Sequence, residues 1–109
     1  MTTQTATAPQ TRFPNWQEIV VYSPEGPQPQ FLLGAEQFKV LMAGLEAGQQ
    51  IPAHPEGLAM YHFLSGTGTM TVNAETLAVH AGDTVITPAG ASRGIVAETK
   101  LAFLAAKPG

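Results

Sequence analysis

The densest group of residues able to do chemistry lies between Gly48 and Gly68. Within it, His54 and Glu56 are two positions apart, so on an extended strand both side chains project to the same side. An imidazole nitrogen and a carboxylate oxygen both suit divalent ions, and a His-x-Glu pair can therefore begin a metal site. The same residues also fit an exposed polar turn, and the spacing alone favours this plainer interpretation.

A second group of turn-forming and charged residues runs from Gly82 to Arg93. Gly82-Asp83 predicts a turn into a strand, and Pro88-Ala89-Gly90 predicts a tight turn out of it. Arg93 follows three positions later and brings a permanent positive charge. Nucleophilic catalysis has little support, because the serines lack a recognisable base and no Gly-x-Ser-x-Gly elbow is present.

Composition limits the size of the protein and its partners. The 109 residues, 44% hydrophobic and 12% charged, suffice for one domain with a core but not for two. A net charge of −3 and scattered Lys and Arg residues argue against a nucleic-acid partner. Cysteine is absent, which excludes disulfides, thiolate metal sites and Cys nucleophiles. No apolar run approaches the ~20 residues of a membrane span, and residues 1–10 do not resemble a signal peptide. We therefore expect a cytoplasmic protein with no membrane partner.

Frequent Gly and Pro residues divide the chain into short pieces rich in β-forming residues, a pattern typical of many short strands. Residues 1–12 lack large apolar side chains and predict a disordered arm, followed by a single domain over 13–109. Residues 73–75 predict a hairpin tip. The expected strand segments are Ile19–Tyr22, Phe31–Leu33, Thr69–Asn73, Leu77–Val79, Thr84–Thr87, Gly94–Ala97 and Leu101–Ala105.

The segment from Phe38 to Leu45 fits two structures. Its apolar residues follow the i, i+3, i+4, i+7 spacing of a helix, but Phe38, Val40 and Met42 also alternate as in a strand. The local pattern favours the helix slightly.

Taken together, the two groups resemble the motifs of the cupin family. The family's first motif runs Gly, five residues, His-x-His, three or four residues, Glu, six residues, Gly. Gly48 and His54 match this motif, and Glu56 takes the second His position. Counting back from Gly66 places Ala59 where the family has Glu.

The second motif of the family runs Gly, five residues, Pro-x-Gly, two residues, His. Gly82, Pro88 and Gly90 match it at the right spacing, and Arg93 stands in the His position. The resemblance covers residues 31–106 and implies an all-β fold, a double-stranded β-helix (jelly-roll) cupin barrel with the motif residues pointing into its mouth. It also implies that residues 37–45 form the strand before the first motif.

The resemblance sets an expectation for each site residue. Metal-dependent cupins present three His and one Glu to one ion, but Ala59 cannot coordinate, and Arg93 has no acceptor lone pair and brings a positive charge. We therefore commit to no metal and no other cofactor. We expect the Glu56 carboxylate to reach salt-bridge distance of the Arg93 guanidinium in place of the ion, with His54 beside them. The predicted function is a small-molecule-binding barrel with a degenerate metal site, whose ligand pocket contains His54, Glu56, Tyr61 and Arg93 and takes a small organic ligand that can be anionic.

The alternative that stays open is an enzyme. A dioxygenase- or isomerase-like cupin would hold a divalent transition metal on His54 and Glu56, with His62 as a third ligand. By the family register His62 faces away from the pocket, and a bulge between Gly57 and Met60 would be needed to reverse it. A metal-free enzyme would use His54 or Tyr61 as acid or base. The sequence identifies no substrate.

The resemblance also implies a homodimer formed by sheet-to-sheet packing with exchange of N-terminal strands. Residues 19–22 are apolar on both faces, which makes them unsuited to an exposed edge strand. We expect this run to be buried in or near the dimer interface.

Overall fold

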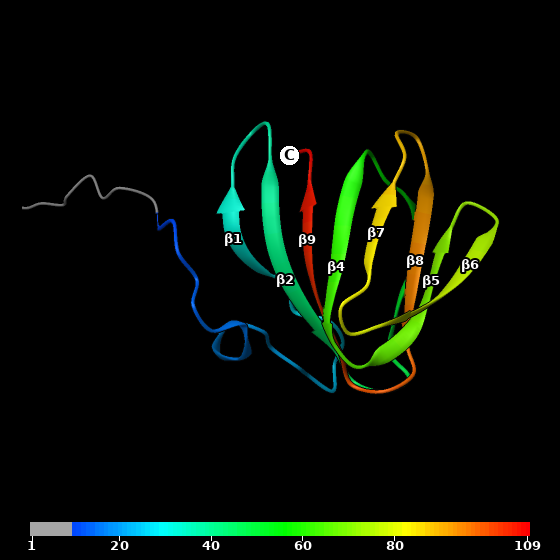
Figure 1. Cartoon of the computed structure of the whole chain (residues 1–109), viewed down its shortest axis with the longest axis horizontal. Coiled ribbons are helices and arrows are strands. Elements are labelled where there is room, and N and C mark those ends of the chain that lie inside the picture. Colours follow the sequence, from blue (N-terminus) through cyan, green and yellow to red (C-terminus); the bar gives the residue numbers. More distant parts are fainter. Residues whose placement is uncertain (1–9) are drawn as a thin grey trace, which may run out of the picture.

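The computed structural model describes residues 10–109, which form two antiparallel β-sheets (Figure 1). Residues 1–9 of the predicted arm over residues 1–12 lie outside the described part of the chain. The domain boundary at residue 12 therefore stays a prediction. Residues 10–12 are exposed and have no regular structure. The elements of the described part are η1 (Trp16–Glu18), β1 (Gln30–Gly34), β2 (Lys39–Leu45), β3 (Gln50–Pro55), β4 (Ala59–Ser65), β5 (Thr67–Val72), β6 (Glu75–His80), β7 (Thr84–Thr87), β8 (Ser92–Ala97) and β9 (Leu101–Lys107).

From β2 onward, consecutive strands change from one sheet to the other in the manner of a jelly roll, except for the β5–β6 hairpin. One sheet has the order β1-β2-β9-β4-β7 and the other the order β3-β8-β5-β6. Figure 1 shows β1, β2, β9, β4 and β7 lying side by side, with β8, β5 and β6 on the far flank. The space between the sheets is filled by apolar side chains, of which the largest fully buried ones are Phe63, Leu45, Met70, Ile95 and Leu101. The prediction of an all-β double-stranded β-helix is confirmed.

The ambiguous segment is strand β2, as the motif resemblance implies and against the slight local preference for a helix. It pairs with β1 on one side and with β9 on the other. All of residues 41–45 are buried, with Leu41, Ala43 and Leu45 in the hydrophobic core. A strand covered on both faces carries a nearly continuous apolar run, and such a run can imitate the spacing of a helix.

Two turns depend on backbone conformations that few residues adopt. Asn73 has φ of +55° at the tip of the β5–β6 hairpin, and this confirms the predicted tip. Gly66, with φ of +88°, joins β4 to β5 directly against the β8–β9 turn. A Cβ atom at this position would lie 1.9 Å from the carbonyl oxygen of Lys100, so only glycine fits.

The expectation of a strand at residues 19–22 is wrong. Ile19 is the C-cap of the short 3-10 helix η1, and no strand begins before Gln30 in the described part. Val20 and Tyr22 instead lie against Gly44 of β2, where a Cβ atom would come within 2.9 Å of both side chains. The Lys100 ammonium lies 4.4 Å from the centre of the Tyr22 ring. The N–H groups of Ile19 and Val20 both donate to the Trp16 carbonyl, and the side chains of Val20 and Tyr22 pack on the chain's own sheet.

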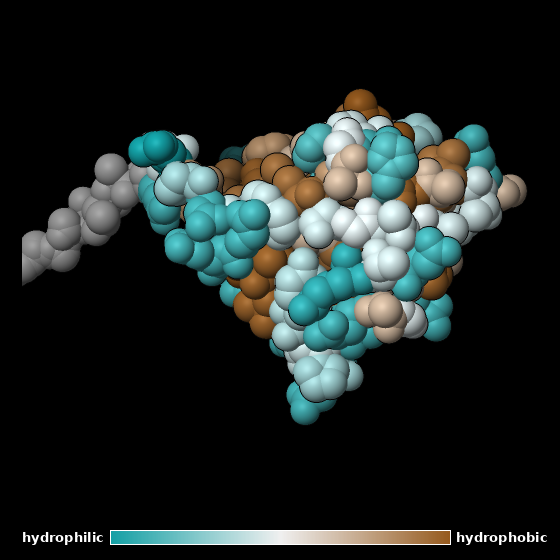
Figure 2. Space-filling view, turned by 60° about the horizontal axis from the view of Figure 1, so that its bottom comes forward, coloured by the Kyte–Doolittle hydropathy of each residue, from teal (hydrophilic) through white to brown (hydrophobic). Residues whose placement is uncertain are grey.

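The outer face of the five-stranded sheet carries a row of apolar side chains. Leu33, Val40, Ala106, Met60 and Ile86 are successive partners across the strands from β1 to β7. Phe13 and Trp16 line a groove with Leu33, Val40 and Met42 of this sheet. Figure 2 shows hydrophobic surface close to the start of the described residues. None of the helices in residues 10–109 is long and apolar enough to cross a membrane.

Candidate ligand site

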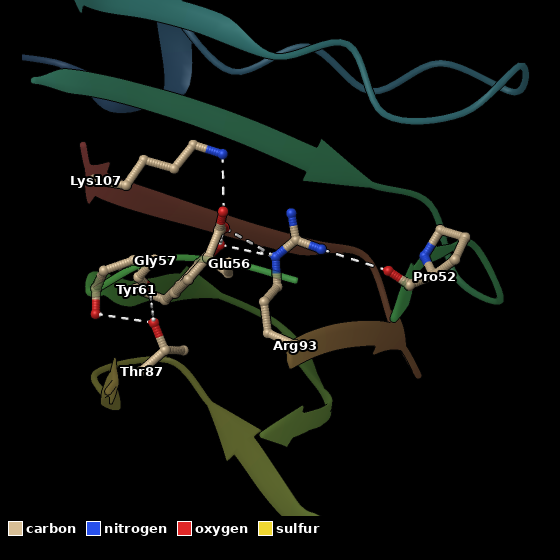
Figure 3. Close-up of polar contacts among 8 residues, drawn as sticks. Pro52, Glu56, Gly57, Tyr61, Thr87, Arg93 and Lys107 are labelled. Carbon is tan, nitrogen blue, oxygen red and sulfur yellow. Dashed lines mark hydrogen bonds and ion pairs between the residues drawn. The ribbon is translucent and has the colours of Figure 1, made fainter. Parts of the chain in front are cut away.

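Four polar side chains from both sheets meet at one end of the space between the sheets. Glu56 follows β3, Tyr61 lies on β4, Arg93 on β8 and Lys107 on β9 (Figure 3). Tyr61 is paired with Ala105 of β9 and shares its inward face. We call these four residues the ionic cluster.

The contacts of the ionic cluster converge on one carboxylate oxygen. Arg93 Nε donates to Glu56 Oε2 at 3.2 Å and to the Tyr61 hydroxyl at 2.8 Å. The Tyr61 hydroxyl in turn donates to Glu56 Oε2. Lys107 Nζ lies 3.6 Å from the same oxygen. The side chains of Glu56 and Arg93 are each only 10% exposed, so this ion pair is largely shielded from solvent.

Two donors of the cluster keep unused capacity. Arg93 Nη1 donates to the Pro52 carbonyl at 3.4 Å, whereas Nη2 has no protein partner among residues 10–109. Figure 3 shows this second terminal nitrogen without a dashed line. Within the same range, Glu56 is the only side chain paired with Lys107, which leaves N–H groups of its ammonium free.

The surroundings fix the charges of the cluster. Burial alone would raise the pKa of Glu56, but the Tyr61 hydrogen bond and the charges of Lys107 and Arg93 outweigh it and lower the pKa below its ordinary value. Burial and the hydrogen bond to Glu56 raise the pKa of Tyr61 to about 12. At neutral pH the cluster therefore contains a carboxylate, a neutral phenol and two cations, and its net charge is positive.

A cavity of about 360 Å³ opens beside the cluster. Arg93, Tyr61 and Lys107 line it, whereas Glu56 does not. The remaining wall is almost entirely apolar and includes Phe31, Leu41, Ala43, Ile51 and Phe103. An apolar cavity of this size with a few convergent polar groups is typical of a small-molecule site.

Three of the residues named from the sequence come together as expected. Glu56, Tyr61 and Arg93 are in direct contact. Arg93 Nε lies 3.2 Å from Glu56 Oε2, the salt-bridge distance expected if this ion pair replaces the metal ion. His54 is different: it pairs with Arg93 across β3 and β8, but after an irregularity in β3 its side chain is exposed. The structure does not place His54 in the cavity wall, and its part in the site stays a prediction.

Lys107 was missed at the level of sequence because the last strand was expected to end at Ala105. The signal was present, since Leu101, Phe103, Ala105 and Lys107 alternate with period two. Extending that alternation by two residues places Lys107 on the inward face with Ala105, as observed.

His62 faces away from the cavity. Its neighbours Tyr61 and Phe63 are buried, whereas His62 is partly exposed and its Nδ1 lies 2.8 Å from Thr84 Oγ1 on β7. The expected register of β4 is therefore correct, and no bulge brings His62 to the site.

The residues present do not fit the metal of the metal-dependent cupins. Ala59, at the Glu position, has no donor atom, and the Arg93 cation pairs with the carboxylate that would have to serve as a ligand. Glu56 Oε2 already accepts a hydrogen bond from the Tyr61 hydroxyl and forms ion pairs with Arg93 and Lys107. In the described part of the chain, no three His, Cys, Asp or Glu side chains are grouped closely enough to hold an ion.

Comparison with known proteins agrees with the fold. Residues 41–106 match the family model described as Cupin domain. A conserved protein of unknown function from Streptococcus pyogenes has a similar structure, with a TM-score of 0.82 and 24% identity. The match covers 91% of this chain and 88% of that chain. An RmlC-like cupin from Desulfovibrio desulfuricans has a TM-score of 0.79 and 21% identity, and the match covers 91% of this chain and 97% of that chain. A protein from Thermotoga maritima described as a predicted oxalate decarboxylase has a TM-score of 0.69 and 25% identity, and the match covers 73% of this chain and 77% of that chain.

No curated protein matches the chain. The family match nevertheless extends over more than half of the residues and includes Glu56, Tyr61 and Arg93. The chain therefore belongs to the cupin family.

Proposed function

We propose that this protein binds a small organic molecule in the cavity between its sheets, with the Glu56–Arg93 ion pair in place of the metal of other cupins. The observation that carries the proposal is the largely buried Arg93 guanidinium, held 3.2 Å from Glu56 at the wall of a cavity of about 360 Å³. A buried cation is costly unless it is paired. Here Arg93 pairs with Glu56 through Nε, while its second terminal nitrogen keeps its capacity to donate to a ligand.

Some residues of the ionic cluster position Arg93, and others contact the ligand. Glu56 and Tyr61 engage Arg93 Nε and so fix the orientation of the guanidinium plane. The outer edge of Arg93 and the Lys107 ammonium then offer hydrogen bonds to a ligand, while the apolar wall receives its carbon skeleton.

The enzyme alternative has less support. A metal-dependent reaction would need His54, Glu56 and His62 on one ion, but His62 is bound to Thr84 on the other face of β4. Tyr61 is a poor general base or acid near neutral pH because burial and Glu56 raise its pKa to about 12. One similar structure is described as a predicted oxalate decarboxylase, but at 25% identity over 73% of this chain it does not carry an activity to the residues of this cavity.

The test is a binding screen with matched variants. Gln50 lines the cavity and is exposed, so Gln50→Trp would fill the cavity without disturbing the core. Thr69→Trp adds the same bulk at an exposed position on β5, outside the cavity wall. Ligand-observed NMR with a mixed library of anionic, neutral and cationic compounds should find binders to the wild type and to Thr69→Trp that Gln50→Trp no longer binds.

Two results would count against the proposal. One is a wild-type protein that binds no compound of any class. The other is stoichiometric Fe, Ni, Mn or Zn in the purified protein that disappears in His54→Ala, because this would restore the metalloenzyme.

The homodimer expected from the sequence stays a prediction. The apolar row from Leu33 to Ile86 offers a surface on which two copies could pack sheet to sheet, and Ile86 is 65% exposed in the single chain. Light scattering at micromolar concentration should give twice the chain mass of 11.4 kDa. A mass equal to one chain would refute the dimer.

A further inference from the structure

We infer that the ligand is a monocarboxylate with an apolar body, an inference that rests on the proposed function and narrows it. Two features of the cavity carry it: the charge that faces the ligand, and the small number of polar groups elsewhere in the wall.

The charge facing the cavity is positive. Arg93 and Lys107 line it, and the Glu56 carboxylate that balances one of them is not part of the lining. With Tyr61 neutral, the cluster has one uncompensated positive charge. A ligand with a single negative charge neutralises this excess, whereas the second charge of a dianion would have no cationic partner left in the cavity wall.

The unused donors suit the two oxygens of one carboxylate. Arg93 Nη2 and the remaining N–H groups of Lys107 have no partner in the described residues. Arg93 Nε and Lys107 Nζ lie 3.2 and 3.6 Å from the same Glu56 oxygen, so the two cationic groups are neighbours that one ligand head group can bridge. Charge-assisted hydrogen bonds of guanidinium and ammonium groups to carboxylate are stronger than those to a neutral carbonyl.

The rest of the wall selects against polar bodies. Leu41, Ala43, Ile51 and Phe103 offer no hydrogen-bonding side-chain atom, and Gln50 is the polar exception. Each hydroxyl of a sugar or polyol would lose its hydrogen bonds to water on entering such a space. An alkyl or aryl body would instead gain by burying apolar surface.

The closing experiment compares probes that share a body and differ in charge. NMR titration at pH 7 would measure the dissociation constants of hexanoate, hexanamide, hexylamine and adipate. Hexanoate should bind the wild type at least tenfold more tightly than each of the other three probes. Lys107→Met should weaken hexanoate at least tenfold while leaving hexanamide within twofold.

Lys100→Met is the matched control, because Lys100 carries the same charge at the opposite end of β9, beside Tyr22. Its affinity for hexanoate should equal that of the wild type. Lys107→Gln serves as the second variant if Lys107→Met does not fold, and the same tenfold loss is expected.

The outcomes separate the inference from the proposed function. Hexanamide, hexylamine or adipate binding as tightly as hexanoate, or hexanoate binding that is unchanged in the Lys107 variants, would overturn the monocarboxylate inference and leave small-molecule binding standing. If neither these probes nor any compound of the mixed library bound the wild type, the proposed function itself would fail.

Discussion

Replacing Arg93 by Met should destabilise the protein more than replacing Arg93 and Glu56 together. Arg93→Met keeps most of the apolar stem of the side chain but removes the cation 3.2 Å from Glu56 Oε2. The carboxylate then stays in a site where its side chain is 10% exposed, with a charge that has lost its nearest cationic partner. The double variant Arg93→Met with Glu56→Gln removes the stranded charge as well.

The expected magnitude follows from the partners that remain. Removing one member of a buried ion pair costs about 3–5 kcal/mol. Lys107 and Tyr61 still face Glu56, so the lower end of this range, ~3 kcal/mol, applies to Arg93→Met. The double variant loses polar contacts without stranding a charge, at a cost of roughly 1–2 kcal/mol.

Urea denaturation at pH 7 of the wild type, Arg93→Met, Glu56→Gln and the double variant measures all four free energies of unfolding. For a domain of this size, the difference of 1–2 kcal/mol between the single and the double variant corresponds to a Tm difference of at least ~4 °C. A double variant less stable than Arg93→Met would refute the reasoning. So would an Arg93→Met variant within 1 kcal/mol of the wild type.

Further predictions concern turns and titration. Gly66→Ala should lower the free energy of unfolding by at least ~2 kcal/mol more than Gly82→Ala, because both have positive φ but only the Cβ at Gly66 meets backbone, at 1.9 Å; equal losses in urea denaturation would contradict this. The folded-state pKa of Glu56 lies below its ordinary value of 4.5, so its stabilisation is present above that pH and is lost as pH falls through the folded pKa. Urea denaturation from pH 6 to pH 3 should therefore show a steeper loss for the wild type than for Glu56→Gln, and parallel curves would contradict it. The pKa of Tyr61 rises from 10.0 to about 12, so its stabilisation is present below pH 10 and is lost as pH rises towards 12. In the same assay, Tyr61→Phe should flatten this alkaline decline, and an unchanged slope would contradict the assignment.

The fold was predictable because its turns need particular residues. The motif glycines Gly48, Gly66, Gly82 and Gly90 all have positive φ, a conformation that other residues rarely adopt. The spacing of these glycines therefore indicates where strands end, independently of the apolar pattern between them. The motif spacing identified β2 as a strand, although its burial on both faces makes its apolar pattern resemble that of a helix.

The ionic cluster was predictable in part, and the limits have physical causes. Glu56, Tyr61 and Arg93 follow from the register of strands next to motif glycines. His54 could not be placed, because the irregularity between Ile51 and His54 in β3 depends on pairing with β8 and leaves no mark in the local sequence. The path of residues 19–22 likewise depends on Gly44, a partner more than twenty positions away.

The ionic cluster joins parts of the chain that are distant in sequence: 37 positions separate Glu56 from Arg93, and 32 separate Tyr61 from Arg93. A few polar contacts cannot offset the entropy of closing such long loops before the strands have paired. We therefore expect the two sheets to be nearly assembled when the cluster forms, and the cluster to contribute little to the transition state of folding. Interactions absent from that state act on the unfolding rate, so we expect the cluster to affect how long the native barrel persists rather than how fast it is reached. A ligand that engages Arg93 and Lys107 would prolong this lifetime further, because it bridges β8 and β9 at the same end of the barrel.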